Sequence, residues 1–196
     1  MFQPRVKLAF VTRYCPPESG WKVFVDIDAS EEGRTGGERS NKQAQERQRD
    51  MQQDAAVVRT ALANLGVTIG GNRGAWFNAN GFPAIEGDRD IIAFHRQVKR
   101  CLIAEVEGIS SGQPEQKLYK AIGQIVMAAG TPPLKDWQLC LVLAVHGKQI
   151  ADHLARATAL NKLGISAVSI TDKKENDLWL FDGAGIFLNK ARNEPL

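Results

Sequence analysis

Short apolar segments separated by polar turns run along this chain, and the clearest pair lies in its middle. Residues 90–94 (Asp-Ile-Ile-Ala-Phe) and residues 101–107 (Cys-Leu-Ile-Ala-Glu-Val-Glu) are apolar runs joined by a basic turn. Two such runs with a short polar turn between them predict a β-hairpin. A turn centred on residues 97–98 places Asp90 opposite Glu105, and directly opposed side chains share one face of a sheet.

Apolar spacing predicts further strands and helices outside this hairpin. We expect helices where apolar residues recur every three to four positions, and strands where they alternate or form a continuous run. The predicted elements are strands at 5–14 and 21–28, a loop at 30–40, a helix at 41–65, strands at 67–69 and 75–85, a helix at 114–129, a strand at 137–145, a helix at 148–163, and strands at 165–170 and 178–181. A strand, a helix and a strand after Asp136 predict a right-handed crossover and parallel pairing.

These elements predict one α/β domain with a central mixed β-sheet flanked by helices. Residues 1–38 are expected to form an N-terminal β-hairpin and a loop. Residues 39–182 form the core, and residues 183–196 are a C-terminal tail with little regular structure. A chain of 196 residues with 43% apolar content is long enough to bury a sizeable core.

Composition excludes several functional classes. No segment approaches the roughly 20 apolar residues of a membrane span, and the first residues lack the apolar core of a signal peptide. Three widely spaced cysteines contain no Cys-x-x-Cys pair, which indicates a reducing compartment and no zinc site. Residues 70–74 are rich in glycine but lack the spacing of a phosphate-binding loop, so a nucleotide-dependent enzyme is not supported. We expect a soluble, cytoplasmic protein with no membrane partner.

Three acidic residues are expected to converge at one end of the central hairpin. Glu107 lies on the same face as Glu105 because side chains alternate along a strand, and Asp90 lies opposite Glu105. Three carboxylates this close would repel one another and raise each other's pKa. A divalent cation removes that repulsion, and Mg²⁺ binds through one or two carboxylates, water and phosphate oxygens. The alternative is that these acids merely end their strands, with Asp90 capping a turn beside Arg89.

The order of these residues resembles a known superfamily. An Asp that opens one strand, followed by Glu105-Val106-Glu107 on the next, is similar to the PD-(D/E)XK nucleases, whose fold is found in many restriction and repair endonucleases. The resemblance implies a restriction-endonuclease-like core in which Asp90, Glu105 and the Val106 carbonyl hold Mg²⁺ (or Mn²⁺). The segment from Gln116 to Tyr119 also resembles the Gln-x-x-(x)-Tyr element of RecB-like members.

Two positions depart from the superfamily pattern. Arg89 stands where Pro often precedes the Asp, and Glu107 stands where the pattern has Lys. Some restriction enzymes of this superfamily carry Glu at that position, and in other members the Lys has moved to the following helix. Lys117 and Lys120 are the candidates for such a relocated lysine here.

The resemblance implies a Mg²⁺-dependent deoxyribonuclease that acts on DNA. A second copy of the chain, in a homodimer, or an accessory protein is a further expected partner. The residues expected to act in catalysis are Asp90, Glu105, Glu107, Gln116, Lys117 and Lys120. The residues expected to contact nucleic acid are Arg89, Arg96, Lys99, Arg100 and Tyr119. Further candidates are an acid on the helix at 41–65 (Glu46, Asp50 or Asp54) and His146 at a strand end. The alternative function is an inactive nuclease-fold protein that binds nucleic acid or another protein.

Overall fold

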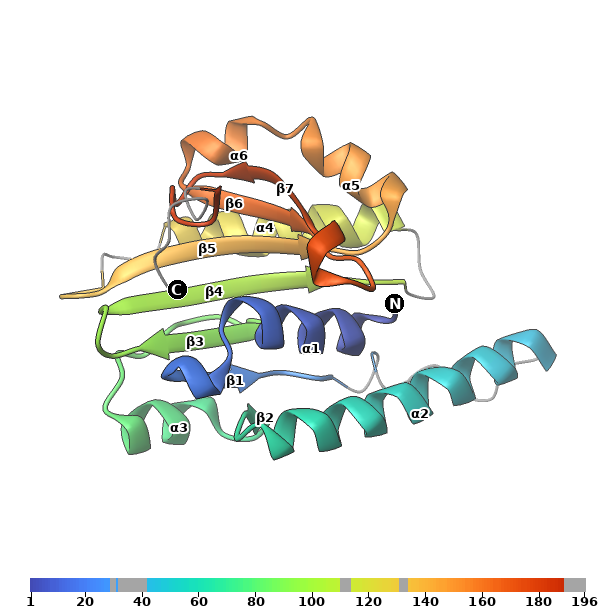
Figure 1. The fold of residues 1–196 in the computed structure, drawn as a ribbon, viewed down its shortest axis with the longest axis horizontal. Helices are drawn as coiled ribbons and strands as arrows, with labels where there is room; N and C mark the ends of the chain where they lie inside the picture. Colours follow the sequence, from blue (N-terminus) through green and yellow to red (C-terminus); the bar gives the residue numbers. More distant parts are fainter. Residues whose placement is uncertain (29–30, 32–41, 110–113, 131–133, 189–196) are drawn as a thin grey trace.

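A seven-stranded mixed sheet runs through the computed structural model, which describes residues 1–28, 31, 42–109, 114–130 and 134–188 (Figure 1). The helices are α1 (Gln3–Tyr14), α2 (Lys42–Asn64), α3 (Arg73–Asn80), α4 (Pro114–Ala129), α5 (Lys148–Ala155) and α6 (Ala159–Lys162). The strands are β1 (Trp21–Val25), β2 (Thr68–Ile69), β3 (Ile91–His95), β4 (Arg100–Glu107), β5 (Gln138–Val145), β6 (Ile165–Ser169) and β7 (Leu178–Asp182).

The strand order is β2-β1-β3-β4-β5-β6-β7. Strands β1, β3 and β4 are antiparallel neighbours, β5 and β6 continue parallel to β4, and β7 closes the sheet antiparallel to β6. The short β2 pairs parallel to β1 at the other edge. The predicted α/β class, the mixed sheet and the parallel crossover after Asp136 are therefore confirmed.

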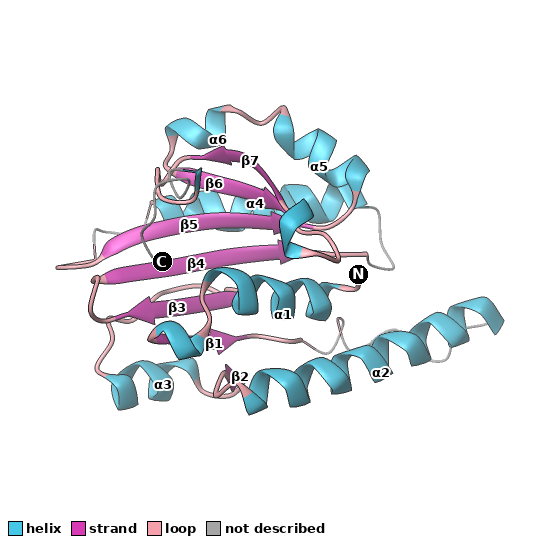
Figure 2. Cartoon of the chain, viewed as in Figure 1, coloured by secondary structure: helices cyan, strands magenta, loops and turns pink. Residues whose placement is uncertain are grey.

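Helices cover both faces of the sheet, which gives three layers (Figure 2). Helices α1 and α2 contribute to the core on one face, and α3, α4, α5 and α6 contribute to the core on the other. The core is divided in two because side chains alternate between the two faces of β4. Leu102, Ala104 and Val106 face α1, while Cys101 and Ile103 face α4. No helix of the described residues is long and apolar enough to cross a membrane.

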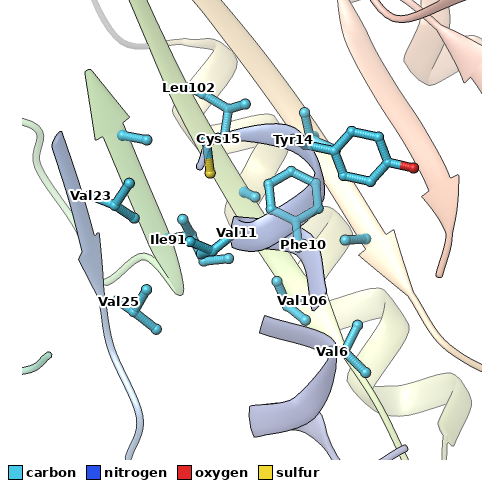
Figure 3. Close-up of a cluster of buried hydrophobic side chains, with 14 of the residues drawn as sticks. Val6, Phe10, Val11, Tyr14, Cys15, Val23, Val25, Ile91, Leu102 and Val106 are labelled. Carbon is cyan, nitrogen blue, oxygen red and sulfur yellow. The ribbon is translucent and has the colours of Figure 1, made fainter. Parts of the chain in front are cut away.

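The expected N-terminal hairpin is wrong, because residues 3–14 form the helix α1. Val6, Leu8 and Phe10 alternate as in a strand, but the side chains that α1 buries include Val6, Phe10 and Tyr14, which recur every four residues. Figure 3 shows this face of α1 packed over β1, β3 and β4. Pro4 lies in the first turn, where its missing N–H costs no hydrogen bond.

Two other predicted elements differ from the structure. Residues 75–85 were expected to be a strand, but the Asn72 side chain accepts a hydrogen bond from the Ala75 N–H and starts α3. Gly81 then ends α3 with a positive φ of 59°. The single helix expected at 148–163 is two helices, α5 and α6, separated at residues 156–158.

The remaining predicted elements are confirmed. These are the strand at 21–28, the central hairpin, the helix at 41–65, the short strand at 67–69, the helix at 114–129, and the strands at 137–145, 165–170 and 178–181. In the hairpin Ile92 pairs with Ile103 and Phe94 with Cys101, which is the predicted register. The loop at 30–40, apart from Glu31, and the tail beyond residue 188 lie outside the described residues.

Candidate functional site

The candidate site lies at the edge of the sheet where β3 begins and β1, β4 and β5 end, on the right in Figure 1. Backbone hydrogen bonds tie these ends together: the Asp26 N–H donates to the Asp90 carbonyl at 2.9 Å, and the His146 N–H donates to the Glu107 carbonyl at 2.9 Å. The start of α1 also belongs to this edge, since the Ile109 N–H donates to the Met1 carbonyl at 2.9 Å. We call this edge the acidic rim, after the carboxylates of Asp90, Glu105 and Glu107.

Glu105 and Glu107 are both buried at the acidic rim. Their side chains are on the α4 face of β4 because they alternate with Ala104 and Val106, which face α1. Only 2% of Glu105 and 8% of Glu107 is exposed. Buried carboxylates are rare unless they are paired, so the partners of these two groups decide what the rim can do.

Asp90 lies within reach of both glutamates, but its own oxygens contact other groups. Its Oδ2 accepts a hydrogen bond from the Val106 N–H at 2.7 Å, and its Oδ1 lies 2.8 Å from Lys7 Nζ. The negative charge of Asp90 raises the pKa of Glu105 and of Glu107, which places the three carboxylates in one electrostatic cluster. Asp90 is thus at the predicted place, held by a lysine that the sequence pattern did not indicate.

Lys7 is the residue that sequence reasoning missed most clearly. It is fully buried on α1, and its ammonium group contacts Asp90, the Glu31 carboxylate at 2.6 Å and the Asp26 carbonyl at 2.5 Å. Although burial alone favours the neutral amine, Asp90 and Glu31 together raise the pKa of Lys7, so the ammonium form persists. Glu31, from the segment after β1, is therefore a fourth acid at the rim.

Arg89 faces inward instead of toward solvent. It is 7% exposed, its Nη1 lies 3.6 Å from Glu105 Oε1, and it donates to the Gln124 carbonyl of α4 at 3.1 Å. The expectation that Arg89 contacts the DNA backbone therefore conflicts with its burial. Its position makes it the counter-ion of Glu105.

Burial raises the pKa of the rim glutamates. Desolvation is the largest cause for both, followed by the Asp90 charge, and the pKa of Glu105 rises to about 8 and that of Glu107 to about 7. Arg89 opposes the rise at Glu105, and Lys117 opposes it at Glu107. Near neutral pH the rim therefore binds protons that a cation would displace.

The charges and contacts at the rim fit a divalent cation in part. Four carboxylates face two buried cations, Lys7 and Arg89, which leaves a formal charge of two negatives. At the rim, three buried carboxylate oxygens have no hydrogen-bond partner, namely Glu31 Oε2, Glu107 Oε2 and Glu105 Oε1, the last of which lies 3.6 Å from Arg89 Nη1. Against this, no three acidic, histidine or cysteine side chains of the described residues are grouped as a ready metal site.

The Val106 carbonyl is an expected metal ligand, and in the structure it already accepts a hydrogen bond. Gln3 Nε2 donates to it at 2.7 Å. A carbonyl oxygen has two lone pairs, so one remains for a further partner. The rim oxygens without a hydrogen-bond partner are on Glu105, Glu107 and Glu31, and that of Glu105 lies 3.6 Å from Arg89 Nη1.

The first turns of α4 bring two predicted lysines near Glu107. Lys117 and Lys120 both lower the pKa of Glu107 electrostatically, against its burial and the Asp90 charge. Gln116 and Tyr119 are exposed on the same turns of the helix. The lysines are thus close enough to Glu107 to act on its charge, and their catalytic role stays a prediction.

The structure does not bring the basic turn of the hairpin to the rim. Arg96, Lys99 and Arg100 lie at the other end of β3 and β4, and even the nearest of them, Arg100, is about 23 Å from Glu107 at 3.3 Å per residue. Arg96 lies over the Phe82 ring, Lys99 lies over the Trp137 ring, and Arg100 donates to Gln138. These residues cannot contact a phosphate that is bound at the rim.

The secondary candidates have other partners or other places. Asp54 of α2 is buried and paired with Arg5 of α1. Glu46 and Asp50 are exposed on the half of α2 that extends past the sheet in Figure 1. His146 Nδ1 lies 2.9 Å from the Ile170 carbonyl, which gives this side chain a structural partner.

A groove of about 990 Å³ runs along α4 next to Arg89. Its walls come from the segment 83–89 and from α4 and the residues after this helix, and they include Lys120, Gln124 and Lys135. The groove therefore lies beside Arg89, the counter-ion of Glu105, and two lysines belong to its lining.

Comparison with known proteins identifies no relative: no protein-family model, no curated protein and no solved structure matches the chain. The class that the structure itself defines is an α/β protein with a seven-stranded mixed sheet flanked by helices. The acidic rim and the groove beside it are therefore the features from which an activity can be inferred.

Proposed function

We propose that this protein is a metal-dependent nuclease that hydrolyses phosphodiester bonds in DNA, of the PD-(D/E)XK type. The observation that carries the proposal is the pair of buried glutamates at the end of the sheet, in which Glu107 Oε2 has no hydrogen-bond partner and Glu105 Oε1 has only Arg89, at 3.6 Å. A buried polar atom without a partner costs free energy, so it indicates a bound group that the protein chain alone does not provide. Mg²⁺ or Mn²⁺ suits oxygen ligands with a net negative charge.

Each rim residue has a role in this proposal. Glu105 and Glu107 hold the cation, and Asp90, positioned by the Val106 N–H and Lys7, adds the third negative charge. A bound divalent cation lowers the pKa of water and polarises a phosphate oxygen. Lys117 and Lys120 stabilise negative charge on the phosphate from the side of α4.

The groove beside Arg89 gives the substrate a path to the rim. Lys120 and Lys135 line it, and lysines on a groove wall bind phosphates without reading sequence. DNA is proposed over RNA through the resemblance to the superfamily. The free, buried cysteines suit a cytoplasmic setting, which belongs to the same proposal.

The test is incubation of the full chain with supercoiled and linear DNA in Mg²⁺, Mn²⁺ or chelator. Cleavage is expected only with a divalent cation, and Glu105→Gln should lower its rate at least a hundredfold because it removes a cation ligand. Glu18→Gln, an exposed acid before β1 at the far end of the sheet, is the matched control. Equal rates for the two variants would refute the site.

A second candidate is a nuclease-fold protein without activity that binds nucleic acid or a protein partner. The pairing of Asp90 with Lys7 and of Glu105 with Arg89 favours it, because protein cations already neutralise two of the carboxylates. It predicts DNA or partner binding without cleavage in any divalent cation. It also predicts a melting temperature that is the same in Mg²⁺ and in chelator.

A further inference from the structure

A cluster of basic side chains lies at the end of the sheet opposite the acidic rim, on the left in Figure 1. Arg96, Lys99 and Arg100 come from the turn between β3 and β4 and the start of β4, and Lys135 comes from the segment before β5. The two segments are in contact, because the Gln138 N–H donates to the Lys99 carbonyl at 2.7 Å. We call these four basic residues the basic end.

The cations of the basic end form no ion pair with any carboxylate of the described residues. Elsewhere in the protein basic side chains do pair, as Lys7 does with Asp90 and Arg13 with Asp177. Four cations and the one acid of the two segments, Asp136, leave an excess of three positive charges. Such an excess on a protein surface attracts a polyanion.

Aromatic rings hold two of these cations in place. The Arg96 guanidinium lies 4.7 Å from the centre of the Phe82 ring, and the Lys99 ammonium lies 5.2 Å from the centre of the Trp137 ring. Both rings pack against the buried Phe94. A cation over an aromatic face stays charged, and the ring takes none of its N–H donors in the plane of the surface.

The backbone at Lys99 favours glycine. Its φ is 51°, and the only other described residue besides glycine with a positive φ is Asp136, in the same cluster, at 65°. Glycine adopts such a φ without strain, so the turn itself does not require a lysine. The ammonium group is the property of Lys99 that the fold leaves unexplained.

The groove along α4 has lining residues from both ends of the sheet. They include Lys135 of the basic end and Arg89, the counter-ion of Glu105 at the acidic rim. From Arg100 to Glu107, β4 covers about 23 Å. Each strand of a DNA duplex advances 3.4 Å per base pair, so about seven base pairs span this distance. A nucleic-acid strand can enter such a groove, whereas a flat lipid surface cannot.

We propose that the basic end is a second binding site for the phosphate backbone of DNA, and that a duplex lying along the groove contacts both the basic end and the acidic rim. The inference rests on the proposed function for the identity of the polyanion, but it requires no divalent cation. Lys99 and Lys135 contact phosphates, and such contacts position the duplex without reading its sequence.

The experiment measures binding of the full chain to a labelled DNA duplex in chelator, by fluorescence anisotropy in a salt series. Lys99→Gln/Lys135→Gln should bind at least about tenfold more weakly and lower the slope of log K against log salt by about two, because two phosphate contacts are lost. The control is Lys173→Gln/Lys174→Gln, which removes the same charge from the exposed turn before β7 and should bind as the wild type does. No loss in the first variant, or an equal loss in both, would overturn the site.

Lys99→Gly separates a lost contact from a damaged fold. Glycine suits the φ of 51° at this position, so the variant should melt no lower than the wild type. It should still bind DNA more weakly, with the salt slope lowered by about one. Wild-type binding by this variant would overturn the phosphate contact of Lys99.

The outcomes separate this inference from the proposed function. Weaker binding by Lys99→Gln/Lys135→Gln, in a protein that cleaves no DNA, would support the second site and refute the nuclease. Cleavage that depends on Glu105, with a wild-type KM in the double lysine variant, would support the nuclease and overturn the second site. A wild-type chain that binds anionic lipid vesicles but no DNA would overturn both.

Discussion

Replacing Lys7 by Met tests how the acidic rim is held together. Lys7→Met keeps most of the side-chain volume but removes the buried ammonium from Asp90, Glu31 and the Asp26 carbonyl. Removing one partner of a buried ion pair costs about 3–5 kcal/mol because the other charge stays buried without compensation. Two carboxylates lose their partner here, so the variant should lie toward the upper end of that range.

The loss of folding free energy in Lys7→Met should be measurable by thermal unfolding. For a domain of this size, 1 kcal/mol changes the melting temperature by about 2–4 °C, so Lys7→Met should melt at least about 10 °C below the wild type in chelator. The matched control is Lys22→Met, which removes an exposed lysine of β1 and should stay within about 2 °C.

A divalent cation should restore part of the stability that Lys7→Met loses. The formal charge of the rim changes from two to three negatives when Lys7 is removed, so Mg²⁺ should raise the melting temperature more in Lys7→Met than in the wild type. If Lys7→Met has the same melting temperature as the Lys22→Met control, the buried ion pairs do not stabilise the rim. If Mg²⁺ has no larger effect on the variant, the excess negative charge is not a cation site.

Three further predictions concern the surroundings of the rim. Gly108→Ala should lower stability by about 1–3 kcal/mol in denaturant titrations, since a Cβ there would lie 2.6 Å from the backbone nitrogen of Gln3; an unchanged midpoint would contradict the close packing of α1 on β4. Asn72→Ala should cost about 1 kcal/mol through loss of the α3 cap, while Asn72→Asp, which keeps the acceptor, should cost much less. Because the pKa of Glu107 is raised from 4.5 to about 7 in the folded state, the folded state binds more protons over this interval. The contribution of Glu107 to wild-type stability in chelator should then fall by up to about 3 kcal/mol from pH 4.5 to 7, in addition to the fall caused by Glu105, whose pKa is raised to about 8. Glu107→Gln should remove that part of the slope, and parallel curves for the two proteins would refute the shift.

The central hairpin could be predicted because two independent constraints agree on it. Alternation of side chains fixes which residues share a face, and the short basic turn fixes which residues are opposite one another. Ile92 therefore pairs with Ile103 as expected, and Glu105 and Glu107 come to the same face. A shift of one residue would have buried the wrong set of side chains.

The apolar residues of α1 satisfy two periods at once, so their alternation predicts a strand where the chain forms a helix. Val6, Leu8 and Phe10 fit a period of two, whereas Val6, Phe10 and Tyr14 fit the helical period. The signal that distinguishes them is Pro4, since a proline near the first apolar residue is typical of a helix start. Asn72 before α3 and Gly81 after it are comparable signals for the helix at 73–80.

The partners of the carboxylates could not be predicted from local pattern. Lys7 and Asp90 are far apart in the sequence, and their contact exists only because α1 packs across the ends of β1 and β3. Arg89 precedes Asp90 in the sequence, yet it is turned toward Gln124 on α4 and Glu105 on β4. Both pairings depend on how the layers pack, and strand and helix periods do not specify it.

The most direct measurement is the location of Mn²⁺ by anomalous X-ray scattering from crystals of the full chain grown with the ion. We expect one or more anomalous peaks at the acidic rim, in contact with carboxylate oxygens of Glu105 or Glu107. The ordered structure around Lys7 and Arg89 should remain. Crystals that bind Mn²⁺ only elsewhere, or show both glutamates paired solely with protein groups at saturating Mn²⁺, would contradict the proposed cation site.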